Sequence, residues 1–434
     1  MARYNTLARA GPGRICTVSS KAVTNVQTHP APLKEQDSEV AAWLQREDKR
    51  QATTLTLIAS ENHSSAAVRA SGQSRLTDKY AEGYPSRRYY GGCEVADGIE
   101  ELARARAKKL FGAEAVNVQP HSGTTANLSA LMALAGPNGR IVGMSLKDGG
   151  HLSHGHPRSA TGILFDPQQY GVDKDGRIDL DEVRDVVKSH RPQVLIAGGS
   201  AYARNIDYQA FADIAKEYEA FLLADIAHPA GLIAAGLVPS PVGIADVVTM
   251  TTHKTMRGPR GGMILSSEAI ARKINSAVFP GSQGGPLMQQ IAGKAIAFGE
   301  ALQPEFRSYQ ERVKENASHL ANRLAEAGLK IVSGGTDNHI VLVDLQGTGV
   351  TGADVEERAL AAGLAVNKNA VPNDPLPPMV TSGLRLGTPA VTTRGFGPSE
   401  IDQLVKIVAG IVQGENPEHY RSTVSELSEA FPLP

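Results

Sequence analysis

The sequence predicts an α/β protein whose large domain is built on a mainly parallel sheet, with a smaller α/β domain at its C-terminal end. From about position 115 onward, short β-branched runs alternate with stretches in which apolar residues recur at helical spacing. The loop "FPGSQGGP" at 279–286 interrupts this alternation, and a long helical stretch follows it. We therefore expect four segments: an N-terminal extension over 1–34, an arm over 35–72, the large domain over 73–309 and the small domain over 310–434.

Six short runs rich in β-branched and other apolar residues predict the strands of the large domain. These runs are Ala115–Val118, Arg140–Met144, Gln193–Ala197, Ala220–Asp225, Ala245–Met250 and Gly262–Leu265. Apolar residues at helical spacing predict helices over Thr124–Leu134 and Tyr208–Tyr218. Strands that alternate with helices in this way favour a sheet covered on both faces.

The stretch "DKDGRIDLDE" at 173–182 predicts a turn followed by the start of another helix. Asp179 and Glu182 have the three-residue spacing of a capping box. A calcium-binding loop is the alternative, but the further ligands that such a loop needs are missing. The cap is therefore favoured.

The small domain is predicted from one strand and three helical stretches. The long helical stretch is "RVKENASHLANRLAEAGL" at 312–329, and the strand is "HIVLVDL" at 339–345. Helices are expected over "GADVEERALAAGL" at 352–364 and "EIDQLVKIVAGIVQ" at 400–413. This order favours an α/β unit that begins near residue 310, within about one helical turn.

Charge and cysteine content limit the classes of partner. The chain has 44 Lys and Arg against 45 Asp and Glu, a formal net charge of -1, so no overall field attracts nucleic acid or an anionic membrane. The two cysteines, Cys16 and Cys93, lack CxxC spacing, which argues against a disulfide framework and a structural zinc site. No apolar run approaches the roughly 18 residues of a membrane-spanning helix. We expect a soluble cytoplasmic protein with small-molecule substrates.

The first 34 residues contain five basic residues and no acidic residue, the composition of a transit peptide. Gly11, Pro12 and Gly13 break any amphipathic helix there. A disordered extension is the favoured interpretation, and mitochondrial import is the minor alternative.

Three groups of reactive side chains follow predicted strands, at the edge of a parallel sheet where ligands collect. Ser122, Gly123 and Thr124 form a strand-to-helix turn, where free backbone N–H groups and the helix dipole can hold a phosphate. Asp225 ends an apolar strand, and its carboxylate needs a cation such as a protonated pyridine nitrogen. Lys254 follows the next strand in a setting where an amine can lose its proton.

Each of these signals also has an ordinary structural explanation. The turn at Ser122 could be a helix cap, Asp225 could form a local ion pair, and Lys254 could be a solvated surface lysine. Surface lysines are nevertheless unusual in a row so poor in charge and so rich in β-branched residues. A phosphate cup, an aspartate and a lysine on successive strand ends together favour pyridoxal 5'-phosphate.

Three other interpretations of the sequence are not favoured: a metal site, a hydrolase and a nucleotide-binding protein. The Gly-rich stretch "GGHLSHGH" at 149–156 brings His151, His154 and His156 together, but no carboxylate accompanies them, so we expect no metal site. The stretch "GGSAY" at 198–202 lacks the final glycine of a nucleophile elbow, and no GxxxxGK[ST] motif occurs.

Several long motifs from about residue 38 onward resemble the serine hydroxymethyltransferase family. They are "IASEN" (58–62), "LTDKYAEGYPSRRYYGGCE" (76–94), "QPHSGTTAN" (119–127), "DGGHLSHG" (148–155), "TTHKTMRGPRGG" (251–262), "PGSQGGP" (280–286) and "GLRLGTPAVTTRGF" (383–396). The resemblance implies a fold-type I pyridoxal phosphate-dependent transferase. It also implies an obligate homodimer, often a dimer of dimers, with active sites shared across the interface.

The resemblance implies how the cofactor is held. Lys254 would be the Schiff-base lysine, Asp225 the partner of the pyridine nitrogen, and His151 the ring that stacks on the cofactor. The remaining cofactor-binding positions would be the phosphate cup Ser122, Gly123 and Thr124, the facing subunit's Tyr80 and Gly285 that complete it, Ser200 and His228 near the phenolic oxygen, and His253 beside the lysine.

The substrate positions follow from the same motifs. Arg385 would bind the substrate carboxylate bidentately, as a guanidinium does better than an ammonium, and Ser60 would touch the same carboxylate. Glu82, Tyr89 and Tyr90 of the facing subunit would handle the hydroxymethyl group and the proton transfers. Tetrahydrofolate would lie at Leu146, Gly150, Leu152 and Asn369.

The implied reaction is the reversible transfer of the hydroxymethyl group of L-serine to tetrahydrofolate, which gives glycine and 5,10-methylenetetrahydrofolate. The sequence departs from the family pattern near the pocket, at His63, Gly72, Gln73, Asp78, Thr125, Ala203 and Pro229. A related hydroxymethyltransferase of α-methylserine, or an aldolase of threonine-like amino acids, is therefore the alternative. A binder that has lost its chemistry is not favoured, because Lys254, Asp225, Glu82 and Arg385 are all present.

Overall fold

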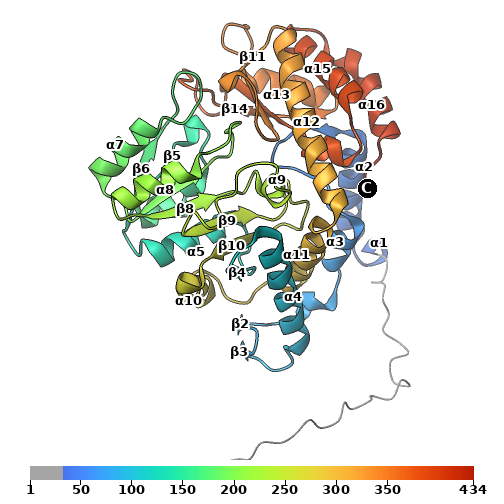
Figure 1. Cartoon of the computed structure of the whole chain (residues 1–434). Helices are drawn as coiled ribbons and strands as arrows, with labels where there is room; N and C mark the ends of the chain where they lie inside the picture. The colour runs from blue at the N-terminus through green and yellow to red at the C-terminus, as the bar shows by residue number, and fades with distance from the viewer. Residues whose placement is uncertain (1–32) are drawn as a thin grey trace, which may run out of the picture. The chain divides into compact units, whose positions relative to one another are not determined.

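The computed structural model describes residues 33–434, and Gln51–Pro434 form one compact unit (Figure 1). The predicted extension over 1–34, with Cys16, therefore lies almost entirely outside the described residues. The first described helices are α1 (Leu33–Gln36) and α2 (Ser38–Thr53). No helix in the described part of the chain combines the length and the apolar character needed to cross a membrane.

A seven-stranded sheet forms the centre of the large domain, with strand order β4-β10-β9-β8-β7-β5-β6. All neighbouring strands are parallel except β10, which runs antiparallel to β4 and β9. The strands are β4 (Ala115–Asn117), β5 (Arg140–Met144), β6 (Asp166–Tyr170), β7 (Val194–Gly198), β8 (Phe221–Asp225), β9 (Val247–Thr251) and β10 (Gly262–Ser266). All six predicted strands are confirmed, and the mainly parallel sheet is confirmed with them.

Strand β6 was missed by the sequence analysis. Its sequence, "DPQQY", has no alternation of apolar and β-branched residues, and Pro167 cannot donate a ladder hydrogen bond. The strand pairs only with β5, at one edge of the sheet. An edge position tolerates a proline and polar residues, so the usual sequence signals of a strand are absent.

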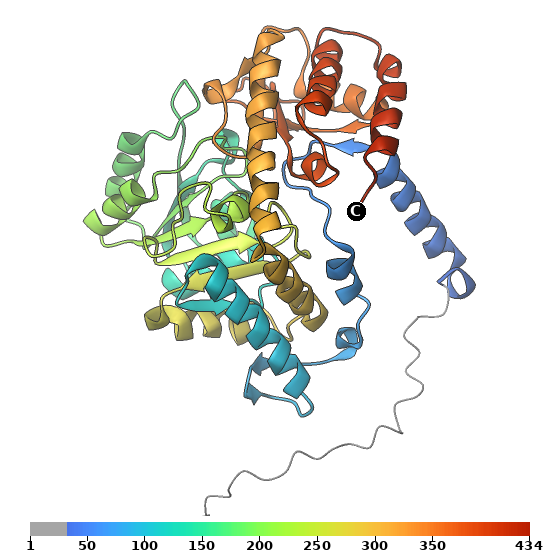
Figure 2. The same ribbon diagram turned by 45° about the vertical axis from the view of Figure 1, so that its right-hand side comes forward.

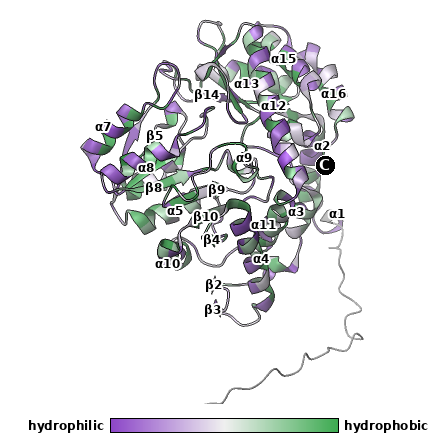
Figure 3. Ribbon diagram, in the orientation of Figure 1, coloured by the Kyte–Doolittle hydropathy of each residue, from purple (hydrophilic) through white to green (hydrophobic). Residues whose placement is uncertain are grey.

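Helices cover both faces of this sheet, as the two turned views show (Figures 1 and 2). The large-domain helices are α4 (Glu94–Phe111), α5 (Gly123–Leu134), α6 (Ala160–Leu164), α7 (Leu180–His190), α8 (Tyr208–Glu217), α9 (Ala230–Ala234), α10 (Glu268–Ser276) and α11 (Met288–Ala301). Helix α3 (Ala66–Ser71) and the short strands β1 (Leu55–Thr56), β2 (Gly83–Tyr84) and β3 (Arg87–Arg88) belong to the segment before α4. In Figure 3, α7 shows mostly hydrophilic residues, whereas β8 is mainly hydrophobic.

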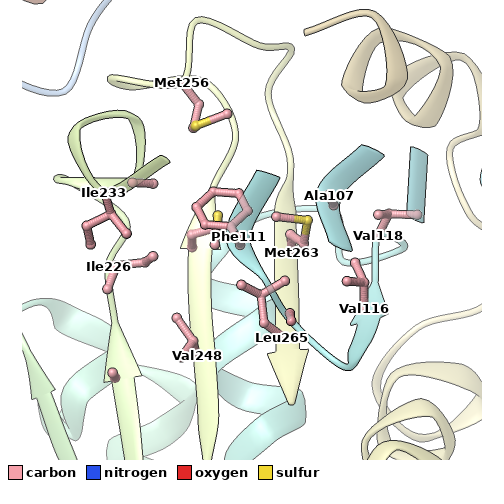
Figure 4. Packing of buried hydrophobic residues seen from close by; sticks show 14 of the residues in the cluster. Ala107, Phe111, Val116, Val118, Ile226, Ile233, Val248, Met256, Met263 and Leu265 are labelled. Atoms are coloured by element: carbon pink, nitrogen blue, oxygen red, sulfur yellow. The ribbon is translucent and has the colours of Figure 1, made fainter. Parts of the chain in front are cut away.

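Alternate residues of each strand point to opposite faces of the sheet, as the strand period requires. In β8, Leu222 and Ala224 join the first core, which α4, α7, α8 and α11 cover, whereas Leu223 packs against α5 and α10. Figure 4 shows part of the first core, with Val248 and Leu265 of the sheet near Phe111 of α4. Both faces of the sheet are thus buried, which explains its nearly continuous apolar strands.

The predicted capping box at the start of α7 is only half formed. The Asp179 side chain accepts hydrogen bonds from the backbone N–H groups of Asp181 and Glu182, as predicted. The Glu182 carboxylate does not return to Asp179; it accepts from the Gly171 N–H at 3.2 Å. The spacing therefore identified the cap correctly, but a neighbouring loop takes the second partner.

A four-stranded antiparallel sheet, β11-β12-β15-β14, forms the centre of the C-terminal part. Its strands are β11 (Lys330–Ile331), β12 (Ile340–Asp344), β14 (Asn367–Asn369) and β15 (Gly383–Gly387), with β13 (Leu364–Ala365) pairing with β1. The helices are α12 (Pro304–Glu326), α13 (Gly352–Ala361), α14 (Pro389–Thr393), α15 (Pro398–Val412) and α16 (Arg421–Ala430). Shorter helical turns are η1 (Arg75–Asp78), η2 (Leu146–Asp148), η3 (Leu152–His154), η4 (Ala277–Ser282), η5 (Val332–Gly334) and η6 (Pro417–Tyr420).

A second core fills this C-terminal part, and α12 takes part in both cores. Val313 belongs to the first core, whereas Ala317, one turn later, belongs to the second. Leu55 and Leu57 of the predicted arm also belong to the second core. The change of core within α12 lies close to the boundary predicted near residue 310, which stays a prediction.

Candidate active site

A cavity of about 330 Å³ lies where β4, β7, β8 and β9 end. Because parallel strands end at the same edge of a sheet, side chains that are far apart in sequence meet there. The predicted residues that line it are Ser60, Ser122, Gly123, Thr124, His151, Ser200, Asp225, His228, His253, Lys254 and Arg385. The cavity is also lined by Glu61, Asn127, Gly199, Ala227, Thr251 and Arg260.

Lys254 follows β9 and reaches the cavity with only 8% of its surface exposed. Among the residues described, none forms a hydrogen bond or ion pair with its amine. The Asn62 side-chain amide donates to the backbone carbonyl of Lys254 at 2.9 Å and so fixes the main chain at this lysine. Burial lowers the pKa of Lys254 to about 8, although the Asp225 charge acts in the opposite direction. Part of the amine is therefore neutral near physiological pH, as a nucleophile must be, whereas an ordinary lysine is almost fully protonated there.

Asp225 ends β8, and both of its carboxylate oxygens accept hydrogen bonds. Oδ2 accepts from the Asn127 amide at 2.8 Å and from the His154 ring at 2.9 Å, and Oδ1 accepts from the Ala227 N–H at 2.9 Å. Burial by itself would raise the pKa of Asp225, but the hydrogen bonds from His154 and Asn127 help to outweigh it, and that pKa lies well below its ordinary value. A fixed negative charge therefore faces the cavity.

The backbone of His151 determines which nitrogen of His154 carries the proton. The His151 N–H donates to Nδ1 of His154 at 3.2 Å, so this nitrogen must be an acceptor. A neutral His154 then carries its proton on Nε2, the nitrogen that contacts Asp225. This arrangement makes His154 a donor that supports the carboxylate charge.

The three histidines of 149–156 point to different partners. His151 lines the cavity, and burial lowers its pKa to about 4, so its ring is neutral. His154 contacts Asp225, whereas Nδ1 of His156 accepts from the Arg158 N–H at 3.3 Å. A neutral ring at the cavity wall can stack on a flat ligand.

Ser122 caps helix α5 and places the helix N-terminus at the cavity. Its hydroxyl accepts from the Thr125 N–H at 3.1 Å. A Cβ at Gly123 would lie 2.7 Å from Cγ2 of Thr251, and a Cβ at Gly262 would lie 2.2 Å from the Ser122 carbonyl oxygen. The backbone of the turn therefore packs directly against the segment around Lys254, and only glycine fits at these positions.

Arg385 stands on β15 of the second sheet and reaches the cavity. Nη1 donates to the Ser200 carbonyl at 2.8 Å and its hydroxyl at 3.2 Å, and Nε donates to Asn367 Oδ1 at 3.2 Å. Burial lowers the pKa of Arg385 to about 10. No carboxylate of the described chain pairs with this guanidinium, so the cavity offers a positive charge to a ligand anion.

His228 and His339 form a buried stacked pair behind Ser200. Their rings are 5.4 Å apart, and Nδ1 of His228 lies 3.2 Å from Nε2 of His339. Burial lowers the pKa of His228 well below its ordinary value and that of His339 to about 3, so both rings are neutral. Nε2 of His228 lies 3.5 Å from the Ser200 hydroxyl, which also accepts a hydrogen bond from Arg385.

The residues predicted to act from the facing subunit do not line the cavity of their own chain. Tyr80, Tyr89 and Tyr90 are exposed by 57%, 74% and 47%, and the rings of Tyr80 and Tyr90 are 5.2 Å apart. The Glu82 charge raises the pKa of Tyr90. A Cβ at Gly285 would lie 3.2 Å from the Tyr80 ring, so these residues form one exposed group, which we call the tyrosine patch.

The four predicted folate positions also lie outside the cavity lining. Leu146 and Leu152, in η2 and η3, are exposed by 37% and 47%. A Cβ at Gly150 would lie 2.0 Å from the Met144 carbonyl oxygen, so this glycine is needed for close packing. Asn369 ends β14, and its amide donates to the Ala370 carbonyl.

The sequence analysis missed several residues of the site, namely Asn62, Asn127, His154, Arg260 and His339. Asn127 lies in "SGTTAN", one helical turn after Ser122, so its spacing on α5 was available as a signal. The contacts of Asn62, His154 and His339 join segments far apart in sequence, so no local pattern predicts them.

Two comparisons with known proteins agree with this geometry. A family model described as "Serine hydroxymethyltransferase" matches residues 33–408. A protein of Leptothrix cholodnii named "Serine hydroxymethyltransferase" is 51% identical over 401 residues, which cover 92% of this chain and 97% of that protein. The chain therefore belongs to the serine hydroxymethyltransferase family, whose members are fold-type I pyridoxal phosphate-dependent enzymes.

Proposed function

We propose that the protein transfers the hydroxymethyl group of L-serine to tetrahydrofolate and so forms glycine and 5,10-methylenetetrahydrofolate. The observation that carries this proposal is one cavity that brings three reactive groups together. It holds the Lys254 amine, the Asp225 carboxylate and the Arg385 guanidinium. The amine suits a carbonyl, the carboxylate a ring cation and the guanidinium an amino-acid carboxylate.

The residues of the cavity fit pyridoxal 5'-phosphate. Lys254 would bind its aldehyde carbon, Asp225 its protonated ring nitrogen and His151 the face of its ring. The N-terminus of α5, from Ser122 to Thr124, would hold the phosphate. When bound there, the cofactor supplies the electron sink for cleavage of the serine side chain.

The chain's own residues then bind and orient the substrate. Arg385 binds the amino-acid carboxylate through two N–H groups and is held in place by Ser200 and Asn367. Ser60 adds a contact to the same carboxylate. Glu82 of the facing subunit would hold or donate the proton at the substrate hydroxyl, and that subunit's Tyr89 and Tyr90 would position the group.

We infer that a homodimer, or a dimer of dimers, shares its active sites. The exposed tyrosine patch with Glu82 supports this arrangement, because an exposed aromatic group of this size marks an interaction surface. Tyr80 and Gly285 would complete the phosphate cup of the facing subunit. Leu146, Gly150, Leu152 and Asn369 are the proposed folate contacts.

We propose that the protein works in a reducing compartment, the cytoplasm. The described part of the chain contains one cysteine, Cys93, which is buried and free. Such a thiol needs no oxidising environment.

The decisive experiment measures serine cleavage by purified protein loaded with pyridoxal phosphate, with and without tetrahydrofolate. We expect folate-dependent release of glycine from L-serine, and slower reactions with α-methylserine and allo-threonine. Lys254→Ala should lose the absorbance band of the bound cofactor, whereas the exposed Lys49→Ala should keep it. Cleavage of α-methylserine or allo-threonine faster than that of serine would replace this proposal by the related reaction.

A further inference from the structure

Lys294, in helix α11, is a buried cation that the proposed reaction does not use. Only 2% of the residue is exposed. Its amine donates to three backbone carbonyls: Val118 at 2.6 Å, Gly262 at 2.8 Å and Pro120 at 3.1 Å. No carboxylate in the described chain forms an ion pair with it. The three carbonyls are therefore its direct partners.

Three carbonyl partners identify the charged form as the one that fits. An ammonium group has three N–H donors and no acceptor, whereas a neutral amine would turn its lone pair toward one of the carbonyls. Burial lowers the pKa of Lys294 to about 7, and the nearby Glu100 charge acts against this shift. The carbonyl dipoles also favour the ammonium, as a cage of oxygen atoms favours a metal cation.

The three carbonyls belong to two segments, one that leads into the phosphate cup and one that follows the Lys254 loop. Val118 and Pro120 belong to the segment that leads from β4 into the cap of α5. Gly262 begins β10, directly after the loop that carries Lys254, and its N–H donates to the Pro120 carbonyl at 2.9 Å. Lys294 thus joins the phosphate-binding turn to the segment of the cofactor-binding lysine.

Close packing restricts the backbone at 261–262, next to Lys294. A Cβ at Gly261 would lie 2.4 Å from Cε of Lys294, so the lysine side chain lies against that backbone. On the other side, Gly262 lies against the Ser122 carbonyl. The backbone at 261–262 is therefore held between Lys294 and the cup.

The hydrogen bonds around Lys294 extend toward the tyrosine patch through Gln119. This residue lies between Val118 and Pro120, two of the three residues whose carbonyls accept from Lys294. The Gln119 amide donates to the Gly83 carbonyl at 2.9 Å and to Glu100 at 2.9 Å. Arg88 pairs with Glu100 at 2.7 Å and donates to the Ala81 and Gly83 carbonyls, which flank Glu82. The loop of Glu82 is thus attached to the same buried network.

We propose that Lys294 is a positioning residue of the cofactor site, whose ammonium fixes the spacing between the phosphate cup and the Lys254 segment. This inference rests on the proposed cofactor. Pyridoxal phosphate would be held at two points, by the amine of Lys254 and by the cup. The second contact strengthens the first only when the distance between the two matches the ligand.

This proposal differs from a purely stabilising role in a measurable way. Pyridoxal has the aldehyde but lacks the phosphate, so it reports binding at one point only. For the apo-protein, the dissociation constant of pyridoxal divided by that of pyridoxal phosphate therefore measures how much affinity the phosphate adds. Loss of general stability has no reason to change this ratio.

The test compares Lys294→Met with the wild-type apo-protein by absorbance titration with both ligands. We expect the ratio to fall about 10- to 100-fold, the usual effect of removing a charged group that orients a binding site. The matched control is Lys314→Met in α12, whose amine donates to a single carbonyl, that of Leu237, at 3.2 Å. Its ratio should stay at the wild-type value.

A second variant tests the inference in case Lys294→Met does not fold. Gly261→Ala keeps the charge but pushes the lysine side chain away, and it should also lower the ratio. An unchanged ratio in the folded variants overturns the inference, even if their melting temperature falls. A wild-type protein that binds neither ligand at Lys254 would instead overturn the proposed function.

Discussion

At the scale of single residues, the site depends on how burial changes charge. Lys254 and Asp225 lie at strand ends of the first sheet, and Arg385 reaches the same cavity from the second sheet, so burial costs each of these charged side chains part of its hydration. Hydrogen bonds maintain the charge of Asp225, whereas the residues from 33 onward give the Lys254 amine none, and burial shifts it toward its neutral form. The same physical cause thus gives opposite protonation outcomes at neighbouring positions.

Lys254 is expected to titrate during cofactor binding. Burial lowers its pKa from 10.5 to about 8, so the neutral amine increases as the pH rises through 8. The rate at which the apo-protein binds pyridoxal phosphate, followed by absorbance, should rise over the same range and then level. In addition, the unfolded state binds more protons than the folded state between pH 8 and 10.5, so this group's contribution to stability increases there. A midpoint near 10.5 would contradict the burial of the amine.

Asp225→Asn should remove the charge while keeping the size of the side chain. We expect kcat for serine cleavage to fall roughly 100- to 1,000-fold, as is typical when one electrostatic contact to a reacting group is lost. The matched control is Asp402→Asn, because Asp402 also contacts a histidine, His319, at 2.9 Å but lies far from the cavity lining. Equal losses in both variants would show that the effect comes from folding.

At the scale of secondary structure, strand ends and helix starts were the easiest part of the site to predict. Ser122 and Asp225 follow local patterns, a cap and an apolar strand, which short stretches of sequence reveal. His339 and Asn62 could not be predicted in this way, because their contacts join segments 111 and 192 residues apart. Strand β6 was missed because an edge position relaxes the usual requirement for apolar residues.

Gly123→Ala tests the close contact between α5 and β9. The added methyl group would lie 2.7 Å from Cγ2 of Thr251 and should displace the phosphate-binding turn. We expect affinity for pyridoxal phosphate to fall about tenfold, which corresponds to roughly 1.4 kcal/mol. Gly98→Ala in α4 is the control, since nothing lies within 4 Å of its added methyl group. Its cofactor affinity should be unchanged when both variants are titrated in parallel.

At the scale of the whole molecule, the shared site can be tested by mixing inactive variants. Lys254→Ala and Glu82→Gln proteins should each be inactive alone. If each site takes its lysine from one subunit and its glutamate from the other, a mixed dimer has one intact site. Statistical mixing then restores about one quarter of the wild-type activity, because about half of the dimers are mixed.

The control for this experiment mixes Lys254→Ala with Asp225→Asn. Both residues line the cavity of the same chain, so no combination of subunits restores an intact site. Activity from the first mixture and none from the second supports the shared arrangement. No activity from either mixture, with dimer exchange verified, would place Glu82 in its own subunit's site.

The residues proposed to hold the cofactor and the residue proposed to bind the substrate carboxylate lie beside different hydrophobic cores. Lys254 and Asp225 follow strands whose apolar residues fill the first core, whereas Arg385 stands on β15, between Leu384 and Leu386 of the second core. Sequence changes in the second core can therefore alter how firmly Arg385, the proposed carboxylate-binding group, is held without disturbing the residues proposed to hold the cofactor. Such separate control would let a lineage adjust how tightly an amino-acid carboxylate binds while the cofactor residues stay intact.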